Sequence, residues 1–523
     1  MKITAVFLEV ASIQQYVFGS NKLKENLGAS YLVENIFKDN LKTAFERISL
    51  KLDLNEWLKN PDQIHICEQG IEAEIGYIGG GNALLLFKEN DFAVKLARQW
   101  SKNLLIETPG LVPSIAISDL ECAALSDSVN FQLEMDELLN KLRINKNNYQ
   151  PQTALPRHGI TAECSHTGLS AECYDKDDKT YISSVAGSKI ANAENAKKEM
   201  NFRFRDVLKD EFDFPDKLDK LGQKEGDNHI SIVHIDGNSM GSRFRDCKTL
   251  MEIRHLSRAV SNATESSFKD MLNEMIQKYD YLMKNFELPD NMLPIRPIIM
   301  GGDDVTFVSH GKLGIYLAEI FMKSFSKKTV SDNKPISSCA GIAITKTKYP
   351  FFRGYELAED LCSQAKKRYR EEKDKNSSWL DFHIAYGGFS GSIEEIRNKN
   401  FKVSEGNLCL RPYRVEGGDD YRNFSECIDG SRYLKISGTK WPNSKLAELR
   451  AVLGQGIPAI EMFIKEMEYR DRELPVIKTI SECKKRGWTY VKTDGQVKVT
   501  PYFDMLELME FYPLDIADYK RVI

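Results

Sequence analysis

The chain has 523 residues, with 72 basic and 76 acidic side chains and a formal net charge of −4. A chain of this length usually folds around more than one hydrophobic core, and the length predicts about three to four domains. The balanced charge argues against a protein that wraps nucleic acid by itself, because such proteins usually carry a basic excess. A chain with this net charge can still have a local basic face.

The N-terminal apolar stretch, residues 3–8, is followed by Glu9 and has no small-residue cleavage site. We therefore interpret it as a buried strand and not as a signal peptide. No apolar run in the sequence approaches the roughly 20 residues needed to cross a bilayer. The ten cysteines include no CxxC pair, which argues against a framework of disulfides. We expect a cytoplasmic protein without a membrane partner.

The same pattern of elements occurs twice along the chain. In the first copy, a predicted strand at residues 3–10 precedes two strands that flank the glycines at 79–81. In the second copy, a strand at 230–236 precedes two strands that flank Gly301 and Gly302. Tight hairpins need positive φ angles, which glycine tolerates, so both glycine pairs predict β-hairpins.

Each predicted hairpin is followed by a helix, a strand and another helix. The predicted ranges are 92–106, 114–117 and 129–142 in the first copy, and 313–327, 338–344 and 355–370 in the second. A central antiparallel hairpin covered by helices is typical of an α/β (α+β) domain. We interpret the two copies as a duplication, although unrelated α/β domains can also match at this coarse level.

These elements divide the chain into four predicted parts. They are a first palm domain at 1–150, a linker module with a Cys/His loop at 151–225, a second palm domain at 226–390 and a mainly helical C-terminal domain at 391–523.

The second hairpin carries Asp303 and Asp304 at its tip, and Asp236 ends the apolar strand ahead of it. Palm enzymes that transfer phosphoryl groups use two divalent cations about 3.5–4 Å apart. Magnesium and manganese prefer oxygen ligands, which three carboxylates at neighbouring strand ends can supply. We predict that these residues bind the metals and are catalytic. The alternative is a simple turn, which Asp and Gly also favour.

Residues beside this acidic group are candidates for nucleotide binding. A strand, a glycine turn and a helix start can present backbone N–H groups to phosphates. Lysines on the predicted helix at 355–370 can bind phosphate oxygens or form a solvated basic face. Two serines can contact the base of a nucleotide and so select it. The candidates are Gly237, Asn238, Ser239, Met240, Gly301, Gly302, Ser337, Ser338, Lys366 and Lys367.

The first hairpin lacks the acidic pair. Gly81 and Asn82 occupy its positions, and Glu9 lies near the position of Asp236. One carboxylate cannot hold two metal ions, so we predict that the first palm is catalytically silent. It can still bind a nucleotide or form half of a pseudo-symmetric pocket.

A second Gly-Gly-Asp-Asp stretch lies at residues 417–420. No apolar strands flank it, in contrast to the first. We interpret it as a surface loop without a catalytic role.

Together, these features resemble the large polymerase–cyclase subunit of type III CRISPR effector complexes. Besides the acidic hairpin, the stretches that agree are 11–18, 28–32, 337–344, 379–383 and 410–413, so the similarity spans nearly the whole chain. The resemblance implies two ferredoxin-like palm domains that make cyclic oligoadenylate messengers from ATP with release of pyrophosphate. It also implies that Asp236, Asp303 and Asp304 hold two Mg²⁺ or Mn²⁺ ions. The near-neutral charge of the chain indicates that partner subunits provide most contacts with guide and target RNA.

The sequence departs from this family in two places. Many members carry an HD nuclease domain, but the sequence contains no His-Asp dipeptide, so we expect no DNase of that type. Members often have a CxxCG zinc knuckle between the palms, whereas Thr167 replaces the second cysteine here. Zinc ligands are still available in this region, although we favour a metal-free loop. They are Cys164, His166 and Cys173, with His158 as a fourth.

Two other functions are compatible with the same residues. A diguanylate-cyclase-like enzyme also uses an acidic hairpin, but Val305 and Thr306 follow the acidic pair where that family has an acidic residue and phenylalanine. A scaffold subunit with a dormant site is the non-enzymatic alternative. Three converging carboxylates without a metal would be costly for such a scaffold to retain.

Overall fold

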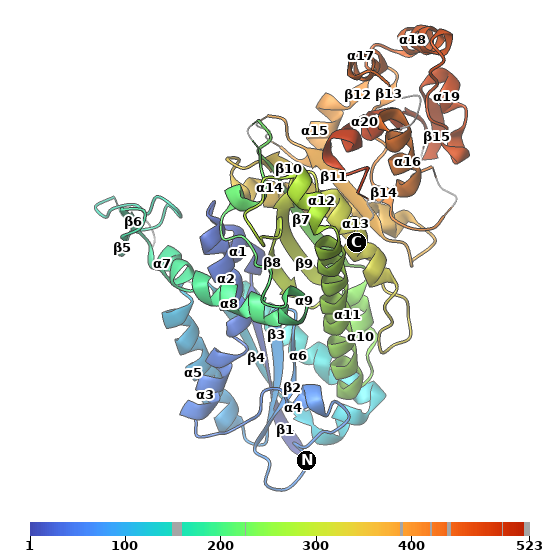
Figure 1. Ribbon diagram of the computed structural model, residues 1–523. Coiled ribbons are helices and arrows are strands. Elements are labelled where there is room, and N and C mark those ends of the chain that lie inside the picture. Colours follow the sequence, from blue (N-terminus) through green and yellow to red (C-terminus); the bar gives the residue numbers. More distant parts are fainter. Residues whose placement is uncertain are drawn as a thin grey trace.

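The structure is a computed structural model that describes residues 1–148, 159–224, 226–387, 391–418, 421–436, 441–493 and 495–516. Figure 1 shows the first palm at the bottom in blue and the second palm above it in green and yellow. The C-terminal part lies at the top right in orange and red. Within the described ranges, no helix is both long and apolar enough to span a membrane.

The first palm contains a four-stranded sheet in the order β2-β3-β1-β4. The strands are β1 (Lys2–Ala11), β2 (Ala73–Gly79), β3 (Asn82–Phe87) and β4 (Val112–Glu121). The helices are α1 (Ile13–Phe18), α2 (Leu23–Asn35), α3 (Asp39–Arg47), α4 (Glu56–Lys59), α5 (Asn90–Glu107) and α6 (Ser128–Asn148), with the 3-10 helix η1 (Cys122–Ser126). Alternate residues of β1 belong to two apolar cores, one that includes α5 and one that includes α6. Burial on both faces explains why this strand is apolar throughout.

The second palm contains a six-stranded sheet in the order β14-β11-β10-β7-β9-β8. The strands are β7 (His229–Gly237), β8 (Ile295–Gly301), β9 (Asp304–His310), β10 (Ser338–Lys346), β11 (Trp379–Ile384) and β14 (Tyr413–Arg414). The helices are α10 (Met240–Asp246), α11 (Leu250–Gln277), α12 (Tyr279–Asn285), α13 (Gly314–Ser326) and α14 (Phe351–Glu371). Four of these strands, β8-β9-β7-β10, repeat the order of the first sheet. The predicted α/β fold with two tandem palms is therefore confirmed.

The segment between the palms is a small hairpin followed by helices. It comprises β5 (Cys173–Asp175), β6 (Thr180–Ile182), α7 (Ser184–Ala191), α8 (Ala193–Arg203), α9 (Arg205–Leu208) and the 3-10 helix η2 (Leu218–Lys220). Helices α7 and α8 pack on α2 of the first palm. In Figure 1 the hairpin projects from the left side of the molecule.

The C-terminal part is mostly helical, but it also contains a four-stranded sheet, β12-β13-β16-β15, that we did not predict. Its helices are α15 (Ile393–Asn400), α16 (Phe424–Lys435), α17 (Asn443–Leu453), α18 (Ile457–Tyr469), α19 (Cys483–Arg486) and α20 (Tyr502–Phe511), with η3 (Lys478–Ile480). The strands are β12 (Lys402–Val403), β13 (Gly406–Asn407), β15 (Thr489–Thr493) and β16 (Gly495–Val499). Two of the four strands have only two residues, which is too short for a periodic signal.

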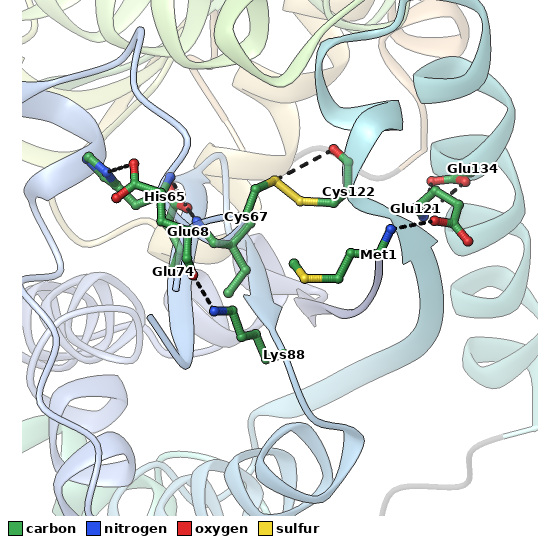
Figure 2. Close-up of a disulfide and its surroundings, with 10 residues drawn as sticks. Met1, His65, Cys67, Glu68, Glu74, Lys88, Glu121, Cys122 and Glu134 are labelled. Atoms are coloured by element: carbon green, nitrogen blue, oxygen red, sulfur yellow. Dashed lines mark hydrogen bonds and ion pairs between the residues drawn. A yellow bond between two sulfur atoms is a disulfide. The ribbon is translucent and has the colours of Figure 1, made fainter. Parts of the chain in front are cut away.

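One disulfide links Cys67, in the loop before β2, to Cys122, just after β4 (Figure 2). The Cα atoms of the two cysteines are 6.1 Å apart. The other eight cysteines are free. The sequence did not reveal this single bond, because folding of the sheet brings the two distant cysteines together. Beside it, the amino group of Met1 lies 3.3 Å from a carboxylate oxygen of Glu121.

Candidate active site

The strand ends of the second sheet bring the three predicted acidic residues together. In the ladder between β7 and β9, Asp236 lies directly opposite Asp304. Gly302 and Asp303 form the turn between β8 and β9, with a φ of 60° at Gly302 that favours glycine. The backbone N–H of Gly237 donates to the carbonyl of Asp303 at 3.2 Å and so ties this turn to the end of β7.

The three carboxylates have different surroundings. Burial raises the pKa of Asp303 to about 7, and the negative charge of Asp236 adds to the effect. Asp236 itself forms an ion pair with Lys366 of α14. Burial lowers the pKa of Lys366, but the charge of Asp236 outweighs burial and holds that pKa above its usual value. Asp304 Oδ1 lies 3.3 Å from Nδ1 of the buried His234. Burial lowers the pKa of His234, but the charge of Asp304 outweighs burial and holds that pKa above its usual value.

The chemistry of this acidic group fits a divalent cation. The group offers hard oxygen donors. A bound cation would offset the cost of burying the Asp303 carboxylate, which raises its pKa, and the repulsion from Asp236, which adds to that effect. Within the described part of the chain, however, no group of three or more His, Cys, Asp or Glu side chains is arranged as a ready metal site. Lys366 is the cation beside Asp236 in this structure, so side chains would have to rearrange for a metal ion to bind there.

The residues that follow Asp236 are held by the start of β10. The backbone N–H of Asn238 donates to the carbonyl of Ser337 at 2.9 Å, and its side-chain amide donates to Ser337 Oγ at 3.0 Å. The backbone N–H of Ser338 donates to Ser378 Oγ at 3.1 Å. Asn238, Ser337 and Ser338 are all buried, so in this structure they order the strand ends.

The next two candidates begin α10. Ser239 has a left-handed backbone, with a φ of 59°, and its hydroxyl lies 3.1 Å from the hydroxyl of Tyr369. Met240 is the first residue of α10 and is buried. Both therefore lie at the junction between the acidic strand end and the helix.

The two candidate lysines point in different directions. Lys366 reaches Asp236, whereas the Nζ atom of Lys367 lies 3.4 Å from Glu394 on α15. The Lys367 side chain is 63% exposed. Of the pair, only Lys366 therefore contacts the acidic group.

A cavity of about 1210 Å³ lies between the two palms and includes the acidic group. Residues from both glycine hairpins line it, at 79–81 and 301–304. Phe18 of the first palm also lines it, and its ring stacks on that of Tyr355 of the second palm at a centroid distance of 3.7 Å. No pattern in the sequence singles out Tyr355, because only the packing of α1 on α14 brings it to the cavity.

The first palm has the predicted glycine hairpin without an acidic pair. Gly80 and Gly81 have φ angles of 59° and 78°, and Asn82 lies opposite Glu9 in the ladder between β1 and β3. Glu9 forms an ion pair of 2.7 Å with Lys146 of α6. This hairpin therefore presents one paired carboxylate where the second palm presents three.

The candidate zinc ligands lie in different surroundings. Cys164 is buried and Cys173 is exposed, while the Nδ1 atom of His166 lies 2.6 Å from the buried carboxylate of Glu25. Burial raises the pKa of Cys164, but hydrogen bonds led by that of Thr167 outweigh it and lower this pKa. No metal cluster occurs in the portion that the structure describes, and His158 lies outside it.

The second Gly-Gly-Asp-Asp stretch is described only in part. Gly417 and Gly418 lie close to the guanidinium of Arg414, and the two aspartates fall outside the described residues.

The two sheets of equal strand order and the acidic hairpin define a tandem-palm protein. Residues 229–377 match the protein family described as Cas10/Cmr2, second palm domain. The second palm is therefore similar to the palm of this family, in agreement with the predicted resemblance. No curated protein matches the chain.

Solved structures of Csm1 have the same fold as the whole chain. A Csm1–Csm4 cassette in complex with cA4 has a TM-score of 0.54 and 11% identity, and covers 99% of this chain and 70% of that chain. The apo Csm1–Csm4 cassette has a TM-score of 0.55 and 10% identity, with 98% and 70% covered. Csm1 in T. onnurineus has a TM-score of 0.54 and 12% identity, with the same coverage. The chain thus has a fold like that of Csm1, and its second palm resembles the Cas10/Cmr2 family.

Proposed function

We propose that this protein is a metal-dependent nucleotidyl cyclase that makes cyclic oligoadenylates from ATP as part of a guide-RNA effector complex. The observation that carries the proposal is the acidic hairpin of a Cas10/Cmr2-type palm, which opens into a cavity shared with the first palm. Proteins of the same fold have been solved with cA4, cA3 and AMPPNP, each together with Csm4. One such pair belongs to a type III-A CRISPR–Csm interference complex, which supports protein partners for this chain.

The size of the cavity supports joining of nucleotides. Small-molecule sites usually measure about 300–1,000 Å³, and this cavity measures about 1210 Å³. It therefore has room for more than one nucleotide, and its two glycine hairpins let nucleotide backbones approach closely from both sides. The first palm then provides the binding surface for one nucleotide, and the second palm provides the reactive groups.

In the proposed reaction, the 3′-hydroxyl of one ATP attacks the α-phosphate of another. The hydroxyl proton passes to solvent, and the hydroxyl oxygen forms the new bond to the α-phosphorus. The bond from this phosphorus to the bridging oxygen breaks, and pyrophosphate leaves with those electrons. Asp236, Asp303 and Asp304 would hold Mg²⁺ or Mn²⁺, which when bound lowers the pKa of the hydroxyl and neutralises phosphate charge. Lys366, once separated from Asp236, would pair with a phosphate oxygen.

The test uses the full chain, alone and assembled with its partner subunits and target RNA, in ATP and Mg²⁺. We expect pyrophosphate and cyclic adenylates, detected by mass spectrometry, from the activated assembly. The double change Asp303→Asn with Asp304→Asn should abolish both products. The same change in the second motif, Asp419→Asn with Asp420→Asn, is the matched control and should not.

Two results would overturn the proposal. One is an activated wild-type assembly that releases no pyrophosphate, and the other is a hairpin double variant that is as active as wild type. Parallel reactions with GTP distinguish a diguanylate-cyclase-like enzyme, which would form cyclic dinucleotides from GTP. Calorimetric titration with Mn²⁺ distinguishes a dormant scaffold, which would bind no metal at the acidic group.

A further inference from the structure

In each palm, the strand that leads into the glycine hairpin lies at the edge of its sheet. These strands are β2 in the first palm and β8 in the second. Both have a register shift shortly before the hairpin, between Ile75 and Tyr77 and between Pro297 and Ile299. An edge strand leaves backbone groups without a partner in the sheet. In this protein, side chains from outside the sheet donate hydrogen bonds to backbone carbonyls of β2 and β8.

The edge of the first palm is bound by a helix of the second. Arg254 of α11 is fully buried. Its Nε donates to the carbonyl of Gly76 at 2.7 Å, and its Nη2 donates to the carbonyl of Ile75 at 2.8 Å. One arginine therefore satisfies two carbonyls at the register shift of β2.

The edge of the second palm is bound from the first palm and from the linker. The hydroxyl of Ser30, on α2, donates to the carbonyl of Ile298. Arg203, the last residue of α8, donates from Nη1 to the carbonyl of Met300 at 3.2 Å. Its Nε donates to Glu265 of α11 at 3.0 Å. The edge strand of each palm is thus bound by a side chain from the other palm.

We propose that Arg203 is a positioning residue for the acidic hairpin, so that the linker helix α8 sets the reactive geometry of the second palm. This inference rests on the proposed function. Arg203 binds the carbonyl of Met300, three residues before Asp303, and fixes it to α11 through Glu265. Within the sheet the acidic hairpin has a neighbour on one side only, so Arg203 supplies a constraint on the other.

The structure predicts that loss of Arg203 changes the geometry of the acidic hairpin and leaves the chain folded. The side chain of Arg203 is 23% exposed, so water can replace it at the Met300 carbonyl if it is removed. A misplacement of about 1 Å in a reactive group can lower the rate about 100-fold. Loss of Arg203 should therefore reduce turnover while the fold persists.

The experiment compares Arg203→Met, Arg203→Lys and Arg205→Met in the activated full-chain assembly. For Arg203→Met we expect kcat to fall about 10- to 100-fold, with KM for ATP changed by less than about threefold. Lysine can donate one of the two hydrogen bonds, so Arg203→Lys should recover part of the loss. Arg205 lies over the ring of Phe202 at 4.3 Å and not on β8, so Arg205→Met should behave as wild type.

A second readout does not depend on catalysis. Amide hydrogen exchange of residues 300–305, measured without ATP, should be faster in Arg203→Met than in wild type. Unchanged exchange together with unchanged kcat would overturn the inference, and so would a loss of activity that only follows a lowered Tm. If the wild-type assembly makes no product, the proposed function fails, while hydrogen exchange still tests the positioning role.

Discussion

Glu9 and Asp236 occupy the same place in the two palms, and each is paired with a lysine from the helix that follows the fourth strand of its palm. The partners are Lys146 on α6 and Lys366 on α14. The residues opposite them differ, because an asparagine faces Glu9 across the ladder and an aspartate faces Asp236. The palms thus share a carboxylate–lysine pair, and only the second adds an acidic hairpin.

The close packing of Asp303 on Gly237 gives a first prediction. A Cβ atom at position 237 would lie 2.8 Å from both Cβ and Oδ2 of Asp303, so Gly237→Ala must displace this carboxylate. We expect pyrophosphate release by the activated assembly to fall at least about tenfold. Gly241→Ala is the control, because its Cβ would meet nothing within 4 Å. Equal activity of the two variants would contradict the predicted role of Asp303.

The two adjacent lysines give a second prediction. Lys366→Met removes the cation beside Asp236, so we expect kcat/KM for ATP to fall about tenfold or more. Lys367→Met removes an exposed side chain near Glu394 and should change kcat/KM by less than about twofold. Steady-state kinetics with ATP measures both values. A larger loss in Lys367→Met than in Lys366→Met would show that the phosphates lie on the other side of α14.

A buried ion-pair network in the C-terminal part gives a third prediction, on stability. Arg411 is buried with Asp504, at 2.9 Å, and with Glu507. Arg411→Ala leaves the buried Asp504 without its cation and Glu507 with only Arg450, at 3.5 Å, which should lower the free energy of unfolding by about 3–5 kcal/mol. Equilibrium unfolding in urea measures this free energy. The exposed pair of Lys141 and Glu137 is the control, since Glu137→Ala should have little effect.

Two buried histidines predict the direction of a pH effect. Burial lowers the pKa of His310 to about 4 and that of His383 to about 3. The usual histidine pKa is about 6.5, so between these values the unfolded chain binds more protons than the folded one. The contribution of these two histidines to stability is therefore full above about pH 6.5 and falls as the pH decreases below it.

The measurement is the Tm at pH 7.5 and at pH 5.5. In the double variant His310→Gln with His383→Gln, the difference between the two Tm values should be smaller than in wild type. The comparison removes the contribution of acidic groups, which the two proteins share. A difference of the same size in both proteins would contradict the assignment.

The linker gives a prediction about metal removal. His166 is paired with Glu25, and Cys173 is exposed, so we expect the loop to be stable without zinc. The purified full chain should contain only substoichiometric zinc by elemental mass spectrometry, and EDTA should leave the Tm unchanged. A full equivalent of zinc that EDTA removes, together with a lower Tm, would show that the loop is a knuckle with other ligands.

The sequence by itself determined the repeat and the acidic hairpin. Both depend on local patterns, namely apolar strands around a glycine pair, and a hairpin forms between residues that are close in the chain. The sequence predicts the strands ahead of the hairpins at 3–10 and 230–236, and the structure has them at Lys2–Ala11 and His229–Gly237. In contrast, β4 (Val112–Glu121) extends well beyond the predicted range of 114–117. The short strands β12 and β13 carry too few residues to show any period.

Only the tertiary structure decided what surrounds the hairpin. The pairing of Lys366 with Asp236, the hydrogen bond from Arg203 to Met300 and the cavity between the palms all join segments that are far apart in the chain. Helix periodicity placed Lys366 and Lys367 on one helix but could not show which of them faces the carboxylates. That choice depends on how α14 packs against the sheet, because packing selects the buried face of a helix and leaves the other to solvent.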